Sequence, residues 1–189
     1  IDSAGIYNVD TNAALGPTPG RTGVILSTGE AEDYTNSSGE ANQSNFTSTN
    51  TSGQNNNSDF NAAAGARTYD ASYLDVDFVP DNNVMTMQFT FSSDEFPEFQ
   101  NSIFQDFVGV WVNGQLIEME VGDGDIDTGN VNNTTNENLY VDNTSDDFNT
   151  EMDGFTLTLS LTMVVNPGQV NSLRIGIADV SDSSFDSNL

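Results

Sequence analysis

Acidic side chains gather beside strand-like runs of the sequence, where they would lie in loops at the edges of a sheet. The same loops are rich in Asn, Ser and Gly. Ca²⁺ takes about six to eight oxygen ligands from carboxylates, carbonyls, amide side chains and water, and such loops supply all of these. We therefore predict a Ca²⁺ site at these strand ends. Its predicted carboxylate ligands are Asp94, Glu95, Asp106, Asp179 and Asp182.

The charge balance both supports this prediction and provides an alternative to it. The chain carries 29 acidic residues against 3 arginines and has no lysine, so its formal net charge is −26. Clustered like charge destabilises a compact fold, and bound cations relieve the repulsion. The alternative is a solvated acidic rim of the kind that suits high salt. On either interpretation, nucleic acid and anionic membranes are poor partners.

A second acidic run, Asp123, Asp125 and Asp127, begins like the Ca²⁺ loop of an EF-hand. The remainder of that motif is missing, since Thr128 stands where the loop needs its glycine and Thr134 stands where it needs its glutamate. The run is either a looser Ca²⁺ loop or a hydrophilic turn.

Catalytic chemistry has little support in the sequence. The chain has no His and no Cys, which removes the commonest general base, the thiolate nucleophile and any disulfide. A glycosidase needs one acid with a raised pKa, usually in an apolar setting, and no acid stands in an obviously apolar run. We expect a binding module and not an enzyme, with Tyr34 and Tyr140, in polar loops, as candidates for ligand contact.

Period-two alternation of apolar and polar residues predicts the elements that hold these loops. It is clearest in four runs, with apolar residues at Phe155–Val165, Leu173–Ile177, Met85–Phe91 and Leu74–Phe78. Asn113-Gly114 lies between the runs Phe107–Val112 and Gln115–Val121 and predicts a hairpin. No convincing amphipathic helix is present. The pattern predicts an all-β, antiparallel and jelly-roll-like sandwich.

Two polar segments, 35–59 and 123–150, are long for loops in a compact domain and are expected to be functional or disordered. The 189 residues suit one domain, and no stretch is apolar for long enough to span a membrane. The chain starts at Ile1 without a signal peptide, so we interpret it as a segment of a larger protein.

Five blocks follow one another along the chain: Gly23–Gly29, Tyr69–Pro80, Phe91–Phe99, Asp153–Thr156 and Ile177–Ser187. Together and in this order they resemble one family, the choice-of-anchor L domains of large secreted bacterial surface proteins. Asp94-Glu95-Phe96 replaces the Glu-Glu-Tyr of the family pattern. The resemblance adds Asp70 and Asp186 to the expected metal ligands. Ser27 and Thr28, in the first block, join the ligand-binding candidates.

The resemblance also implies a function. Similar domains occur in giant RTX-type adhesins, where one such module is a Ca²⁺-dependent peptide-binding domain that recognises protein ends on target cells. We therefore expect an extracellular, monomeric module that binds a peptide or a protein C-terminus. The alternatives are a Ca²⁺-dependent lectin that binds cis-hydroxyls and a structural spacer that Ca²⁺ only stiffens.

Overall fold

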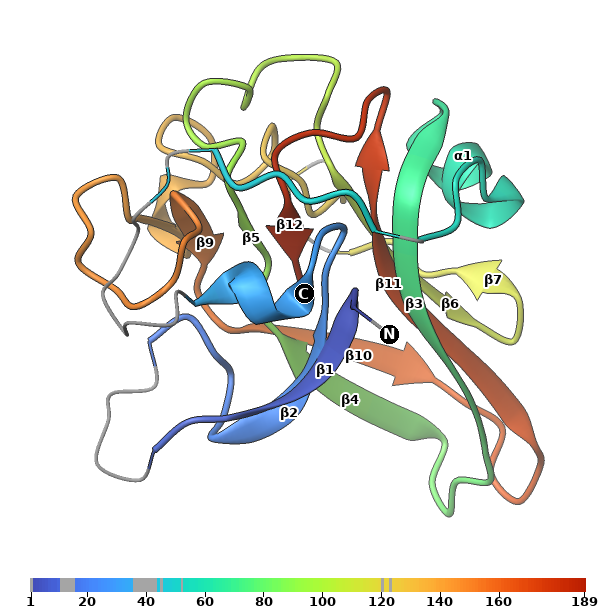
Figure 1. The fold of residues 1–189 in the computed structure, drawn as a ribbon. Coiled ribbons are helices and arrows are strands. Elements are labelled where there is room, and N and C mark those ends of the chain that lie inside the picture. The colour runs from blue at the N-terminus through green and yellow to red at the C-terminus, as the bar shows by residue number, and fades with distance from the viewer. Residues whose placement is uncertain are drawn as a thin grey trace.

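The computed structural model describes residues 2–10, 16–35, 44, 46–51, 53–119, 121–122 and 124–189. Its elements are almost all strands (Figure 1). The strands are β1 (Ala4–Asn8), β2 (Thr22–Leu26), β3 (Thr68–Phe78), β4 (Val84–Phe89), β5 (Ser92–Ser93), β6 (Phe107–Val112), β7 (Gln115–Leu116), β8 (Tyr140–Asp142), β9 (Gly154–Thr156), β10 (Leu159–Val164), β11 (Asn171–Val180) and β12 (Ser187–Asn188). One α-helix, α1 (Ser58–Ala64), and two 3₁₀ turns, Ala31–Tyr34 and Glu137–Leu139, complete the described part.

The strands form antiparallel sheets that pack into a sandwich, which confirms the predicted fold class. One four-stranded sheet has the order β3-β11-β6-β7, and the other has the order β12-β5-β9-β8. Two-stranded ribbons, β10-β4 and β1-β2, continue the second layer (Figure 1). The main core lies between the layers and includes Phe91, Val110 and Ile177, each fully or almost fully buried.

The strand predicted over 155–165 is in fact two strands. β9 pairs with β5 and β8, whereas β10 pairs with β4. Leu159, Leu161 and Met163 are buried as the alternation predicts, but Leu157 is 47% exposed. Its backbone N–H donates to Leu139 O at the point where the chain passes from one sheet to the other. The change of sheet interrupts the alternation.

The Asn113-Gly114 hairpin is confirmed, because both residues have positive φ, 52° and 76°, as a type I′ turn requires. Its second strand is shorter than the expected Gln115–Val121 run and includes only Gln115–Leu116. The chain then leaves the sheet and buries Met119 in the main core.

Helix α1 was not predicted, since seven residues are too few to show an amphipathic period. Asn57 caps its N-terminus by accepting hydrogen bonds from the N–H groups of Asp59 and Phe60. Phe60 then packs edge-on against Trp111 at 4.9 Å between ring centroids, and forms a second core on the outer face of β6 and β11. α1 is the only α-helix among the described residues, and no described helix is long and apolar enough to cross a bilayer.

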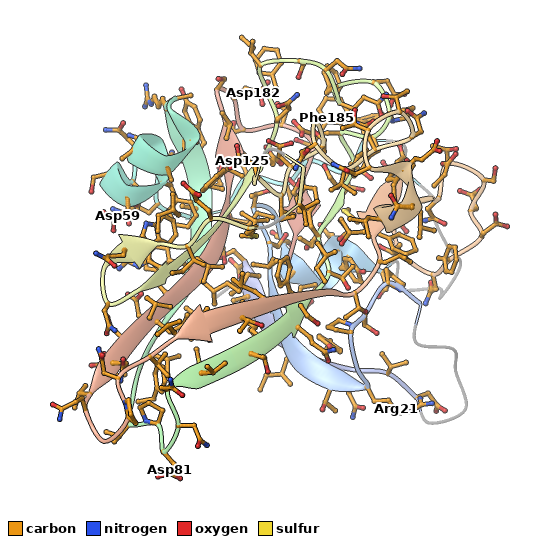
Figure 2. The ribbon with its side chains drawn as sticks, turned by 180° about the vertical axis from the view of Figure 1, so that it is seen from behind. Arg21, Asp59, Asp81, Asp125, Asp182 and Phe185 are labelled. Atoms are coloured by element: carbon orange, nitrogen blue, oxygen red, sulfur yellow. The ribbon has the colours of Figure 1, made fainter. Side chains whose placement is uncertain are left out.

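The acidic strand ends lie together at one end of the sandwich. Asp94 follows β5, Asp106 precedes β6, and Asp182 follows β11. Figure 2 shows Asp182 and Phe185 at the end of the molecule opposite the turn that carries Asp81.

The second core is expected to be essential for the fold. Phe60→Ala removes a side chain that is 0% exposed, so unfolding in urea should show a loss of about 3–5 kcal/mol. Phe46→Ala is the matched control, because Phe46 is 62% exposed and its loss should change stability by less than about 0.5 kcal/mol. Equal effects of the two substitutions would contradict this assignment.

Candidate functional site: buried carboxylates at one end of the sandwich

Strand register places three of the predicted carboxylates side by side. β11 pairs Ala178 with Phe107 and Asp179 with Tyr69. Asp179 therefore lies next to Asp106 on one side and next to Asp70 on the other. A register shift between Ile177 and Asp179 bends β11 at this point.

The other layer brings in three more of the predicted acids. Asp94 and Glu95 continue from β5, and Asp186 leads into β12, which pairs with β5. The N–H of Asp94 donates to Asp186 O at 3.2 Å, and the N–H of Asp106 donates to the Glu95 carboxylate at 3.2 Å. Glu95 thus connects the two layers of the sandwich.

Several carboxylate oxygens are satisfied by backbone and hydroxyl donors. Glu95 also accepts from the Thr128 hydroxyl at 3.1 Å, and Asp94 accepts from the N–H groups of Thr47 and Asp153. The N–H and hydroxyl of Thr49 donate to Asp186 at 2.9 and 2.7 Å. These donors partly replace the water that burial removes.

Two buried oxygens of the cluster have no donor in the described part of the chain. Asp106 is 1% exposed, and its Oδ1 accepts from the N–H of Val180 at 3.3 Å. The Ser187 side chain is close enough to lower the pKa of Asp106 somewhat, but Oδ2 has no hydrogen-bond partner of ordinary geometry. Asp179 is 2% exposed, and its Oδ1 has no partner. Buried carboxylate oxygens without donors are costly, so their environment is incomplete without an added cation or proton.

Burial is the main cause that raises the pKa of these acids. It raises the pKa of Asp94 and of Glu95 to about 8 and that of Asp186 to about 6. The pKa values of Asp106 and Asp179 are held well above the ordinary range, first by burial and then by neighbouring negative charge. Every charged neighbour that contributes to these shifts is itself an acid.

Arg174 shows what a basic partner does elsewhere in the molecule. Its guanidinium lies 2.7 Å from Asp75 and 2.5 Å from Asp59. Hydrogen bonds from Arg174 lower the pKa of Asp75, in contrast to the buried acids. Arg174 is therefore engaged outside the cluster.

The donor set fits a hard cation such as Ca²⁺ in chemistry, because it consists of oxygen atoms alone. Asp106 and Asp179, with their orphaned oxygens, are the residues that would hold it, with Glu95 beside them. However, no three Asp or Glu side chains in the described ranges are arranged as a metal-binding group. A cation here would need carbonyl or water ligands as well, and the predicted role of these acids as metal ligands stays a prediction.

The Asp125 loop is ordered by the side chains of Asp127 and of several asparagines. Asp127 accepts from the N–H groups of Gly129 and Asn130 at 2.8 and 2.7 Å, and buried Asn132 bonds backbone on both of its sides. Asp125 is exposed, and Asp123 lies outside the described residues. Ile126 is fully buried in the main core, so this loop is anchored by packing.

The four ligand-binding candidates lie in different environments. Ser27 and Thr28 are buried, and the Thr28 side chain hydrogen-bonds Asp179 and accepts from the N–H of Ser187 at 3.0 Å. Tyr34 donates to Pro17 O at 3.3 Å. Tyr140 is half-buried at the start of β8, with its ring 4.8 Å from that of Phe96. Thr28 is thus a buried hydrogen-bond partner of the carboxylate cluster.

The sequence did not reveal the polar residues that surround the carboxylate cluster and donate hydrogen bonds to it. Thr47 and Thr49 belong to the segment interpreted only as a long polar loop, yet both bond buried acids. Asp153 is also buried, and its charge raises the pKa of Asp94 after the larger effect of burial. The only signal for Asp153 was its place in one of the five motif blocks.

Gly29, in the first of the five motif blocks, lies where the segments that carry Asp186 and Thr49 come close to the backbone, which explains why this residue is a glycine. A Cβ atom on Gly29 would overlap the Asp186 carboxylate and the Thr49 hydroxyl. Any side chain at this position would push Asp186 out of the cluster.

The raised pKa values predict how stability depends on pH in a chelator. The folded state holds protons on Asp94 and Glu95 up to about pH 8, whereas the unfolded chain releases them near pH 4. Stability from these groups is therefore greatest below pH 4 and is lost as the pH rises to 8. The melting temperature in chelator should fall from pH 5 to pH 8.

Asp94→Asn should flatten this profile, and Asp81→Asn, on an exposed turn, should leave it unchanged. Repeating the scan in about 1 M NaCl screens surface repulsion but not the cost of burial, so the slope should persist. A melting temperature that rises from pH 5 to pH 8 would contradict the assignment.

Comparison with known proteins assigns the family. No curated protein and no solved structure gives a significant match. The family model of the choice-of-anchor L domain matches residues 2–189. The name denotes domains of surface-anchored bacterial proteins, which fits a cell-surface or extracellular location. With a match over nearly its whole length, the chain belongs to the choice-of-anchor L domain family.

Proposed function

We propose that this domain is a Ca²⁺-dependent ligand-binding module of a bacterial surface protein. The observation that carries the proposal is the pair of orphaned carboxylate oxygens on Asp106 and Asp179, which are buried and whose pKa values no basic side chain lowers. Ca²⁺ supplies the missing positive charge and accepts carboxylate, carbonyl and water oxygens together. Asp106 and Asp179 hold the ion. The ion thereby also stabilises the segment that carries Thr47 and Thr49, which donate hydrogen bonds to Asp94 and Asp186 of the same cluster.

The ligand is a peptide, and specifically a protein C-terminus on a target cell. A surface with a net charge of −26 repels a free carboxylate. A carboxylate of the ligand is therefore bound only where a cation faces solvent. Asp182 is the candidate ligand for a cation in such an exposed position, because it is half-exposed and its negative charge contributes to the raised pKa of buried Glu95. The resemblance to the peptide-binding module of RTX adhesins supports the same ligand class.

A second candidate function is a structural spacer in which Ca²⁺ only stiffens the fold. The depth of Asp106 and Asp179 favours it, because an ion held at that depth by these two residues would have no coordination position that faces solvent. A glycan ligand that offers cis-hydroxyls is the remaining alternative. We propose no catalytic activity, since the chain contains neither His nor Cys.

Millimolar Ca²⁺ should raise the melting temperature above that in chelator by about 5–10 °C, because an ion bound only to the folded state stabilises it. Mg²⁺ should raise it less, since it requires tighter octahedral geometry. Asp106→Asn should lose most of the Ca²⁺ effect and be no less stable than the parent in chelator. Asp77→Asn, at an exposed position, should keep the full effect. Identical melting curves with and without Ca²⁺ would refute the calcium proposal.

Ligand binding should depend on Asp182 and not on Asp125. In Ca²⁺, the parent should bind members of a peptide array with free C-termini and not a glycan array. Asp182→Ala should abolish this binding with little loss of stability, and Asp125→Ala should leave it nearly intact. Loss of binding in Asp125→Ala alone would place the site in the other loop. Binding to neither array, with stabilisation by Ca²⁺ intact, would leave the spacer function.

A further inference from the structure

The segment 46–51 crosses the acidic end of the sandwich as a chain without regular secondary structure. In Figure 1 this segment, in cyan, passes in front of β5 and β12. Burial alternates along it, because its even-numbered residues are exposed, whereas Thr47, Thr49 and Thr51 are buried or half-buried. The threonines therefore face the protein, as alternate residues of an extended chain do.

Two of these threonines bond different acids of the cluster. The N–H of Thr47 donates to the carboxylate of Asp94. The N–H and the hydroxyl of Thr49 donate to the carboxylate of Asp186 at 2.9 and 2.7 Å. In the opposite direction, the N–H of Asp186 donates to Thr47 O at 2.7 Å. The segment is thus attached to side chains of the cluster itself.

The third threonine leads to the neighbours of Asp179. The hydroxyl of Thr51 lies 3.5 Å from Asp70 Oδ1 and donates to Thr28 O at 3.2 Å. The Thr28 side chain in turn bonds Asp179, and the charge of Asp70 raises the pKa of Asp179 after the larger effect of burial. The segment therefore covers the cluster on the side of a residue that would hold the ion.

No apolar side chain anchors this segment. Phe46, its only large apolar residue, is 62% exposed, and none of residues 46–51 belongs to either hydrophobic core. The loop that bonds Glu95 through Thr128 differs, because Ile126 anchors that loop in the main core. A segment with few buried apolar contacts and no strand ladder opens more easily than the elements around it.

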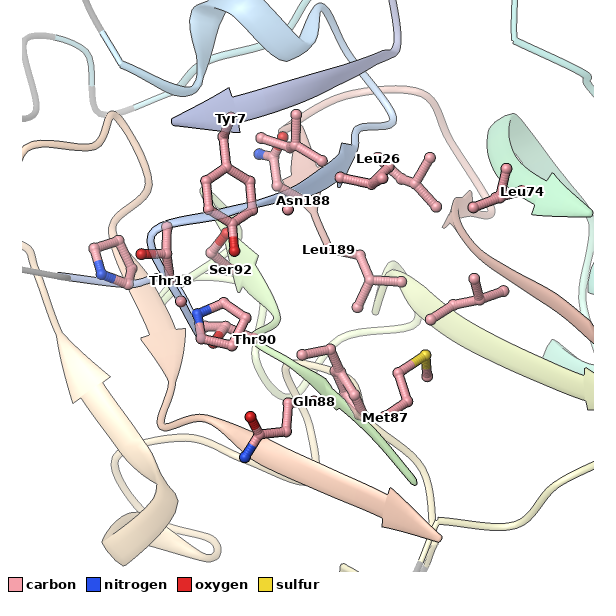
Figure 3. A pocket seen from close by; sticks show the side chains of 18 of the residues that line it. Tyr7, Thr18, Leu26, Leu74, Met87, Gln88, Thr90, Ser92, Asn188 and Leu189 are labelled. Atoms are coloured by element: carbon pink, nitrogen blue, oxygen red, sulfur yellow. The ribbon is translucent and has the colours of Figure 1, made fainter. Parts of the chain in front are cut away.

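The larger cavities of the molecule do not lead to the buried carboxylates. Asp106 and Asp179 are 1% and 2% exposed. Cavities of about 440, 530 and 960 Å³ lie elsewhere, and none of them is lined by an acid of the cluster. Figure 3 shows the first of these, beside Tyr7, Leu26 and Met87. A cation that reaches Asp106 and Asp179 must therefore displace a covering segment.

We propose that residues 46–51 form a lid over the buried carboxylates, and that Ca²⁺ enters and leaves Asp106 and Asp179 only when this lid opens. The inference rests on the proposed Ca²⁺ binding and adds a control of its rate. The lid opens by exchanging its bonds to Asp94 and Asp186 for bonds to water, so the strength of those bonds sets the rate of opening.

A bound ion also favours the closed lid. It holds the carboxylates in the positions in which they accept the hydrogen bonds of the lid, so the closed state binds the ion better than the open state. An ion behind a closed lid is released slowly. The domain therefore keeps its ion, and the structure that the ion stabilises, through short falls in Ca²⁺ concentration.

The first test measures the release of Ca²⁺ from the loaded domain after rapid mixing with the fluorescent chelator Quin-2. The slowest phase should have a rate that does not rise with chelator concentration, because opening of the lid limits it. Thr49→Val removes the hydroxyl that bonds Asp186 and should speed this phase at least about tenfold. Thr144→Val is the matched control and should leave the rate unchanged. The N–H and hydroxyl of Thr144 bond Asp142 at the same distances, 2.9 and 2.7 Å, but at an exposed position.

The second test follows the lid itself. Chymotrypsin cleaves after Phe46 only when the residues around it leave the protein surface, so this cut, identified by mass spectrometry, reports opening. It should be at least about tenfold slower in millimolar Ca²⁺ than in chelator. Thr49→Val should speed it in both conditions, and Thr144→Val should not. Equal melting temperatures of the two variants in chelator, within a few degrees, would exclude global unfolding as the cause.

The outcomes separate the lid from Ca²⁺ binding. If Ca²⁺ raises the melting temperature but both threonine variants release it at the same rate, the lid is wrong and the proposed function stands. The same holds if release rises in proportion to chelator concentration, or if Ca²⁺ does not slow the cut after Phe46. If Ca²⁺ changes neither the melting temperature nor the cut, both proposals are wrong.

Discussion

Burial of carboxylates without a basic partner is the constraint around which this end of the domain is organised. Glu95, Asp106 and Asp179 come from three different strand ends and meet where two sheets close on each other. Backbone N–H groups and threonine hydroxyls satisfy part of their oxygens, and two oxygens are left without donors. A fold that collects negative charge in this way needs either protons or a cation to reach its full stability.

Two very short strands connect this cluster with the rest of the layer. β5 leads from Ser92 to the cluster at Asp94, and β12 leads from the cluster at Asp186 to Asn188. Because the two strands pair, one small piece of sheet joins the acidic end to the rest of its layer.

Membership in the choice-of-anchor L domain family and the chemistry of the molecule point in the same direction. An acidic sandwich with polar loops at one end is suited to binding at a cell surface, where cations are available. In the proposed function, the acidic end would bind a charged peptide end through an ion.

The sequence alone determined the all-β fold, the Asn113-Gly114 hairpin and the gathering of acids at strand ends, because these depend on local alternation, turn chemistry and the order of residues along the chain. It could not reveal helix α1, the change of sheet at Leu157, or the part that Thr49 plays at Asp186. The burial of the acids and the orphaned oxygens were decided only by the tertiary structure. Both depend on which strands pair and pack across the sandwich, and contacts between residues far apart in the chain leave no local pattern in it.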